Sequence, residues 1–144
     1  MAGNSDPIFS KSGDVSSNGT TGMATTLTTA TGDYTGISAN HQLVFTADAT
    51  NGGFIQRLRF QAIGTNTASV ARIYLNNGST VGTATNNTFF GQQSLPGTTA
   101  INTAATTEID YPMNFAINPG FRIYVGLGTT VAAGWVVTAI GGKY

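Results

Sequence analysis

The sequence predicts an all-β protein, an antiparallel, jelly-roll-like β-sandwich of about seven or eight strands with an extended N-terminal arm. Its composition is the first reason, because only 8% of the residues are charged, against about 25% in an average globular domain. Threonine, which favours strands, and glycine and asparagine, which favour tight turns, are abundant. Short strand-like runs follow one another between turn signals, and no apolar stripe has helical spacing. We therefore expect essentially no helix.

Residues 1–40 are expected to form a polar arm, and residues 41–144 a single β-sandwich domain. The large apolar residues of the first segment are few and isolated, so the segment buries too little surface to order itself. Ile8 and Phe9 form an apolar pair directly after Pro7. This pair is a candidate anchor in the groove of a neighbouring molecule, and a terminus without a partner is the alternative.

From residue 42 onward, strand-like runs alternate with turn signals. The expected strands are residues 42–47, 54–63, 69–76, 88–95, 105–117, 121–128 and 134–142. Asn77-Gly78, at the end of the third run, is the strongest short hairpin signal that a sequence offers. Strand order cannot be derived from one sequence.

Alternation assigns an inner and an outer face to these runs, because successive side chains of a strand point to opposite sides. The residues expected inside are Ala71, Ile73 and Leu75, then Phe121, Ile123, Val125 and Leu127, and finally Trp135, Val137 and Ala139. Arg72 and Tyr74 in the third run, and Arg122 and Tyr124 in the sixth, are then expected on the outer face.

The segments RIYLNNGST (72–80) and RIYVGLGTT (122–130) match at about half of their positions. A single repetition is too little for a solenoid, which needs about three units or more. We interpret the two segments as equivalent strands of a Greek-key sandwich. A binding motif used twice and a chance match are the alternatives.

His41 is the only histidine, and no G-x-S-x-G turn accompanies it. We interpret it as a surface or subunit-contact histidine rather than as part of a hydrolytic triad. Glu108 and Asp110 lie two residues apart, so both face the same side of one strand. Glycosidase carboxylates usually flank the substrate from different strands, and we expect this pair to bind arginines, with Arg57, Arg59 and Arg72 available.

The chain lacks other recognisable chemical equipment. It has no cysteine, which excludes disulfides and thiolate metal sites. The turn at Asp48 and Asn51 lacks the spacing of a calcium loop. Six basic and six acidic side chains cancel, so no net charge attracts nucleic acid or an anionic membrane. No apolar stretch is long enough to span a bilayer, and the first residues lack a signal-peptide layout. We expect a non-enzymatic protein without a cofactor or metal.

A surface rich in hydroxyls, amides and glycine suits broad contacts, because few long charged side chains lose freedom on binding. Such a surface fits a protein packed against copies of itself or against a larger lattice.

Three segments, residues 57–79, 95–99 and 118–144, resemble small β proteins encoded among the structural genes of tailed phages and prophages. Several of these look like capsid decoration, or cement, proteins. The resemblance covers about residues 42–144 and implies a virion protein that is made in the host cytoplasm and binds the capsid surface. It would bind as a homotrimer and clamp neighbouring subunits of the major capsid protein. No catalytic or binding residues carry over from it.

The candidate contact residues are Ile8 and Phe9 in the arm, and Arg72, Tyr74, Arg122 and Tyr124 on the outer face. Two alternatives remain open. One is a phage tail, neck or fibre component. The other is a carbohydrate-binding β-sandwich module in which Tyr74 or Tyr124 stacks on a sugar, while Trp135 belongs to the core.

Overall fold

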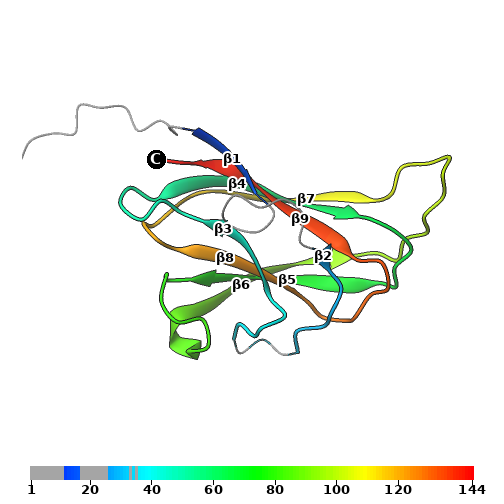
Figure 1. The fold of residues 1–144 in the computed structure, drawn as a ribbon, viewed down its shortest axis with the longest axis horizontal. Coiled ribbons are helices and arrows are strands. Elements are labelled where there is room, and N and C mark those ends of the chain that lie inside the picture. Colours follow the sequence, from blue (N-terminus) through cyan, green and yellow to red (C-terminus); the bar gives the residue numbers. More distant parts are fainter. Residues whose placement is uncertain (1–11, 17–25, 33, 35) are drawn as a thin grey trace, which may run out of the picture.

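The computed structural model describes the backbone of residues 12–16, and residues 26–32, 34 and 36–144 in full. Two antiparallel sheets form two layers (Figure 1). The strands of the described residues are β1 Ser12–Ser16, β2 Thr26–Leu27, β3 Gln42–Thr46, β4 Gly53–Ala62, β5 Ser69–Asn76, β6 Asn87–Leu95, β7 Glu108–Ile117, β8 Arg122–Leu127 and β9 Trp135–Lys143. A 3₁₀ turn, η1 Ala84–Asn86, is the only helical element of this part of the chain, and no described helix is long and apolar enough to cross a membrane.

The all-β prediction is confirmed. One sheet has the order β1-β9-β4-β7, with β2 also paired to β9, and the other has the order β3-β8-β5-β6. The hydrogen-bonded pairs include β1 with β9, β3 with β8, β4 with β7 and β5 with β6. This pairing is nested, from the ends of the chain inward, as in one long antiparallel hairpin divided between two sheets.

All seven predicted strands are confirmed, and β1 and β2 are additional strands in the segment assigned to the arm. β1 pairs with β9 from Ser12 opposite Lys143 to Ser16 opposite Ala139. β2 pairs with the beginning of β9, and the side chain of Leu27 is buried. The described parts of residues 12–40 therefore lie against the sandwich, and the domain division at residue 40 stays a prediction.

The hairpin expected at Asn77-Gly78 is present, because β5 pairs antiparallel with β6, but its loop is longer than a two-residue turn. Gly78 has the positive φ of 87° that such a turn requires, but β6 begins only at Asn87, which pairs with Asn76. The Asn77 N–H donates to the Asn86 carbonyl at 3.0 Å, and the Asn76 amide donates to Asn87 Oδ1 at 2.7 Å. Asparagine side chains satisfy the polar groups of this longer loop, which removes the need for a tight turn.

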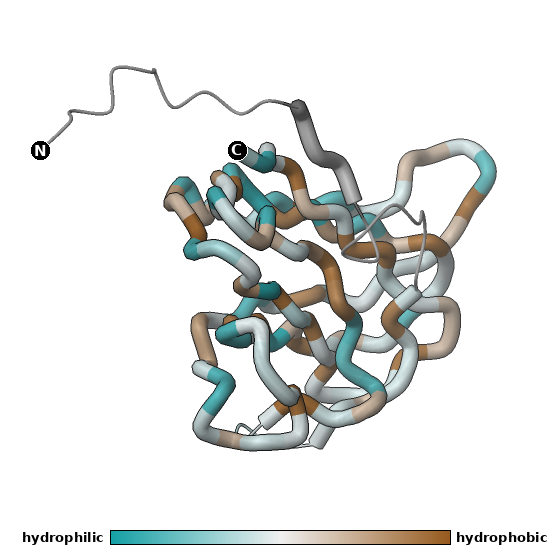
Figure 2. Tube along the Cα trace, turned by 60° about the vertical axis from the view of Figure 1, so that its left-hand side comes forward, coloured by the Kyte–Doolittle hydropathy of each residue, from teal (hydrophilic) through white to brown (hydrophobic). Residues whose placement is uncertain are grey.

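The core lies between the two sheets and confirms the predicted faces. Trp135, Val137 and Ala139 of β9 are fully buried, as are Ile123, Val125 and Leu127 of β8. Figure 2 shows that short hydrophobic stretches alternate with pale or hydrophilic ones along the chain. The core leaves the outer faces and the edges of the sheets as the surfaces available for function.

Candidate functional site

A row of apolar and aromatic residues crosses the outer face of the sheet β3-β8-β5-β6. Tyr74 of β5 lies opposite Phe89 of β6 and opposite Tyr124 of β8, and Tyr124 lies opposite Leu43 of β3. The rings of Tyr74 and Phe89 are 5.5 Å apart in an edge-to-face arrangement. Directly opposite side chains in antiparallel strands contact one another. We call Phe89, Tyr74, Tyr124 and Leu43 the aromatic row.

A segment that precedes β3 covers part of this face. We call residues 30–32, 34 and 36–41 the covering segment. The Thr31 N–H donates to the Leu127 carbonyl at 2.8 Å, and the Thr31 hydroxyl donates to the same oxygen at 3.0 Å. Gly126 permits this close approach, since a Cβ there would collide with Thr31 Oγ1 and lie 2.7 Å from His41 Cδ2.

Tyr34 of the covering segment extends the aromatic row. Its ring packs edge-to-face on Phe89, with ring centroids 5.1 Å apart. The Arg72 guanidinium lies 4.3 Å from the centre of the Tyr34 ring and donates to the Gly32 carbonyl. Arg72 therefore holds the covering segment through a cation–π contact and a hydrogen bond. Tyr34 is 53% exposed and Phe89 is 38% exposed, so both rings remain accessible.

His41 is only 7% exposed, so its interpretation as a surface histidine is wrong. Its ring packs edge-to-face on Tyr74, with ring centroids 5.0 Å apart. The Ser38 backbone N–H donates to His41 Nδ1 at 2.9 Å. Nε2 is buried and has no hydrogen-bond partner among the described residues. Packing of the covering segment onto the sheet, which sequence patterns do not reveal, is the reason for this burial.

The contact between Ser38 and His41 resembles a nucleophile–base pair, because Ser38 Oγ lies 3.1 Å from Nδ1. However, the Ser38 N–H already occupies that nitrogen, and no described carboxylate contacts Nε2 to orient the ring. Burial lowers the pKa of His41 below its usual value, and the positive charge of Arg72 lowers it further. The geometry is that of a local turn that holds the covering segment in place.

Stability is expected to fall when the pH drops below about 6.5, the usual pKa of an unfolded histidine. The reason is that the unfolded chain then binds a proton that the buried His41 of the folded chain does not. Linkage limits the loss from one group to about 1.4 kcal/mol per pH unit. Urea unfolding at pH 7.5 and at pH 5.5 measures the change in the free energy of unfolding. The variant His41→Gln should lack the part of this change that comes from the histidine. Equal midpoints for the wild type at both pH values would contradict the prediction.

The structure places the four outer-face candidates on the predicted face, with one correction. Tyr74 is only 1% exposed, because His41 and Phe89 cover it. It is therefore not available as a contact residue. Arg72, Arg122 and Tyr124 are half-buried. Of these, Tyr124 lies directly in the aromatic row, whereas Arg72 is engaged with the covering segment.

The arm candidates Ile8 and Phe9 lie outside the described residues. Sequence reasoning missed four members of this surface, namely Tyr34, Leu43, Phe89, and His41 as a packing residue. Phe89 carried a signal, because a Phe-Phe pair in a strand must place one ring on each face. Tyr34 carried none, since its position depends on a long-range contact.

The carboxylates of β7 bind the arginines of β4, as expected. Asp110 lies 3.0 Å from Arg59 and 3.3 Å from Arg57, and Glu108 lies 3.3 Å from Arg59. The hydrogen bond from Arg59 holds the pKa of Asp110 below its usual value. Arg72 takes no part in these ion pairs, which lie on the other sheet. The four side chains neutralise one another.

The turn after β3 uses its acidic side chain for local structure. Asp48 Oδ1 accepts hydrogen bonds from the backbone N–H groups of Thr50 and Asn51 at 2.9 and 2.8 Å. This is ordinary turn chemistry for aspartate. Within the described part of the chain, no group of three or more histidine, aspartate or glutamate residues is arranged to hold a metal ion.

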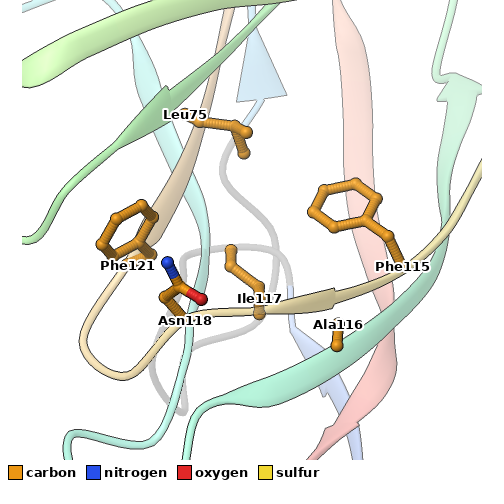
Figure 3. Close-up of a pocket in the computed structure, with 6 residues that line it drawn as sticks. All are labelled: Leu75, Phe115, Ala116, Ile117, Asn118 and Phe121. Carbon is orange, nitrogen blue, oxygen red and sulfur yellow. The ribbon is translucent and has the colours of Figure 1, made fainter.

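The edge strands β6 and β7 form one side of the sandwich, and this side is more exposed to solvent than the core. Among the described residues, neither strand pairs with another strand on its outer edge. Phe90 of β6 is 39% exposed, and its ring lies 5.2 Å from that of Phe115. At one end of this side is a pocket of about 210 Å³, the end pocket (Figure 3). It is lined by Leu75, Phe115, Ala116, Ile117, Asn118 and Phe121.

The fold and these surfaces define a two-sheet antiparallel β protein with partly exposed aromatic residues on the outer face of one sheet. Comparisons of the chain with protein-family models, with curated proteins and with solved structures found no match.

Proposed function

We propose that the protein is a non-enzymatic structural protein of the virion that decorates and stabilises the outside of a tailed-phage capsid. It binds subunits of the major capsid protein and assembles as a homotrimer. The aromatic row is the observation that carries this proposal. The row combines exposed Tyr34, half-exposed Tyr124 and neighbouring Arg72, of the types that contribute most to protein–protein binding. It also includes exposed Phe89, a residue type enriched at interfaces.

The wider surface supports the same proposal. The chain has few charged residues, and the four charges of β4 and β7 neutralise one another. An interface formed by such a surface loses little side-chain entropy and desolvates few unpaired charges. The nested strand pairing also supports a jelly roll, an architecture found in viral capsid and lectin domains.

The mechanism is mass action. A protein that binds the assembled lattice, but not the dissociated subunits, stabilises the lattice by the free energy of that binding. Many copies, each joined to others of its trimer, add up through multivalency, so each single contact can be weak.

Removal of the aromatic row is expected to weaken binding to capsids that lack this protein by at least about tenfold, which corresponds to about 1.4 kcal/mol. The variant is Phe89→Ser combined with Tyr124→Ser, and binding is measured by co-sedimentation over a range of concentrations. Ile101→Ser is the matched control, because Ile101 is 55% exposed in the loop between β6 and β7. Equal binding of the wild type and the double variant would exclude the aromatic row as the contact.

The copy number in purified particles distinguishes the locations. Quantitative mass spectrometry is expected to find hundreds of copies, in a simple ratio to the major capsid protein. A few dozen copies or fewer would move the protein to the tail, the neck or a vertex. Absence of the protein from particles would favour the alternative of a carbohydrate-binding module. In such a module the exposed ring of Tyr34 would stack on a sugar. A glycan array would test that function.

A further inference from the structure

The end pocket is a largely apolar recess in the described part of the chain. In Figure 3 the side chains of Leu75, Phe115 and Phe121 surround a common space above Ile117. Asn118 is the only polar residue that lines it. Leu75, Phe115 and Phe121 are only half-buried although they pack against the core. A further apolar side chain in this recess would therefore remove more of their surface from water.

The size of the end pocket suits one aromatic side chain. An apolar cavity of about 150 Å³ is known to accept benzene, whereas pockets for larger organic ligands have about 300–1,000 Å³. A volume of about 210 Å³ therefore fits a phenyl ring with a small neighbouring side chain. A short apolar segment with a phenylalanine therefore matches the size and the apolar lining of the end pocket.

The chain contains such a segment close to where the description of its backbone begins. Ile8 and Phe9 precede Ser12, the first residue of β1, by four and three residues. Ser12 lies opposite Lys143, which lies opposite Gly53, and Gly53 lies opposite Ile117 at the floor of the end pocket. The beginning of β1 and the end pocket are thus at the same end of the sandwich, three strand spacings apart.

The reach of the backbone favours a neighbouring molecule as the source of this segment. Three strand spacings amount to about 14 Å, whereas three residues span at most about 11 Å. Even if the chain ran fully extended and sideways from Ser12, the backbone of Phe9 would stop short of Ile117, so its ring would reach the pocket only in that extreme conformation. From Ile117 the pocket extends to Phe115, which register places level with Asp14 rather than with Ser12, and to Leu75 of the other sheet. A second copy of the chain has no such restriction.

We propose that the end pocket binds Ile8 and Phe9 of a second copy of this chain, with the phenyl ring of Phe9 inserted. The inference deepens the self-association in the proposed function and identifies the surface that performs it. Segment and pocket are different surfaces of one chain, so each copy can give its segment to the next. A ring of three copies then fills every pocket, which is the trimer of the proposed function.

Chemical cross-linking tests the contact, and the absence of cysteine from the chain makes the assay clean. The variant is Ser10→Cys with Ala116→Cys, because Ser10 follows the anchor and Ala116 is exposed at the pocket. Purified protein is treated with a short bismaleimide after mixing of ¹⁴N- and ¹⁵N-labelled chains. We expect covalent dimers and trimers in which peptides of both isotopes are joined. Adding Phe9→Ser should lower their yield at least tenfold.

The matched control is Ser10→Cys with Ala104→Cys, since Ala104 is also an exposed alanine but lies in the loop between β6 and β7. This control should give few cross-links. Three results would overturn the proposal: cross-links only within one chain, an equal yield from the control, or a yield independent of Phe9. The assay contains no capsid, so its failure leaves capsid binding by the aromatic row standing. Absence of the protein from virions would likewise leave a positive cross-link intact.

Discussion

Replacement of Asn66 by leucine is expected to lower the free energy of unfolding by about 2–6 kcal/mol, at about 1–3 kcal/mol for each buried group left without a partner. Asn66 is buried, and its Oδ1 accepts hydrogen bonds from the backbone N–H groups of Ala133 at 3.0 Å and Gly134 at 2.7 Å. Leucine has a similar volume but accepts neither bond. The buried Gly134 N–H and the partly buried Ala133 N–H would then lack this acceptor.

The carbonyl groups that accept from the Asn66 side chain would be less affected than the two N–H groups, because each keeps another hydrogen bond. Its Nδ2 donates to the carbonyls of Gly64 and Gly134, but Gly64 also accepts from the Thr98 hydroxyl, and Gly134 from the Ile63 N–H. The penalty therefore comes mainly from the two orphaned donors. Asn66 joins three loops at one end of the sandwich, those between β4 and β5, β6 and β7, and β8 and β9.

Urea denaturation followed by circular dichroism measures this effect. Asn102→Leu is the matched control, because Asn102 is exposed in the loop between β6 and β7. Its expected change lies within about 0.5 kcal/mol, as for most surface substitutions. If Asn66→Leu changed the free energy of unfolding no more than the control does, the hydrogen bonds of Asn66 would contribute little to stability.

Replacement of Trp135 by alanine is expected to lower the free energy of unfolding by about 3–5 kcal/mol, the usual range for a buried aromatic side chain. Trp135 is fully buried at the start of β9, opposite Leu27 of β2 on one side and Ala62 of β4 on the other. Truncation leaves a large cavity where both sheets meet. It also removes a contact surface for β2, so β2 should lose protection from hydrogen exchange first.

Trp135→Phe separates the volume of this side chain from its polarity. The indole N–H is buried and has no hydrogen-bond partner in the described structure, so phenylalanine removes an unsatisfied donor while it keeps most of the apolar contact. We expect a loss less than half of that of the alanine variant. Val136→Ala, on the opposite face of β9, is the control. A loss below about 1 kcal/mol for Trp135→Ala would contradict the assignment of this residue to the core.

The two proposed contacts use different parts of the molecule. The aromatic row lies on the outer face of one sheet, whereas the end pocket lies between the sheets beside Ile117 and Phe121. One copy can therefore bind a lattice and a neighbouring copy at the same time. Variants of the two surfaces are expected to act independently, because they share no residues.

Local patterns predicted the strands between residues 42 and 142, because alternation and turn residues act over a few positions. The inner position of Trp135 and the shared face of Glu108 and Asp110 followed from the same period of two. β1 and β2 did not follow from it. Their residues are mostly small and polar, and they become strands by pairing with β9, more than a hundred residues away.

For the candidate site, too, some features were predictable from the sequence and others were determined only by the tertiary structure. Alternation alone placed Arg72, Tyr74, Arg122 and Tyr124 on one outer face, since that depends only on the spacing of neighbours along a strand. Register aligned Tyr74 with Phe89 and Tyr124, and packing of the covering segment buried Tyr74 beneath His41. These contacts join residues far apart in the chain. Such contacts depend on how the sheets and the covering segment pack, for which a local sequence pattern carries no signal.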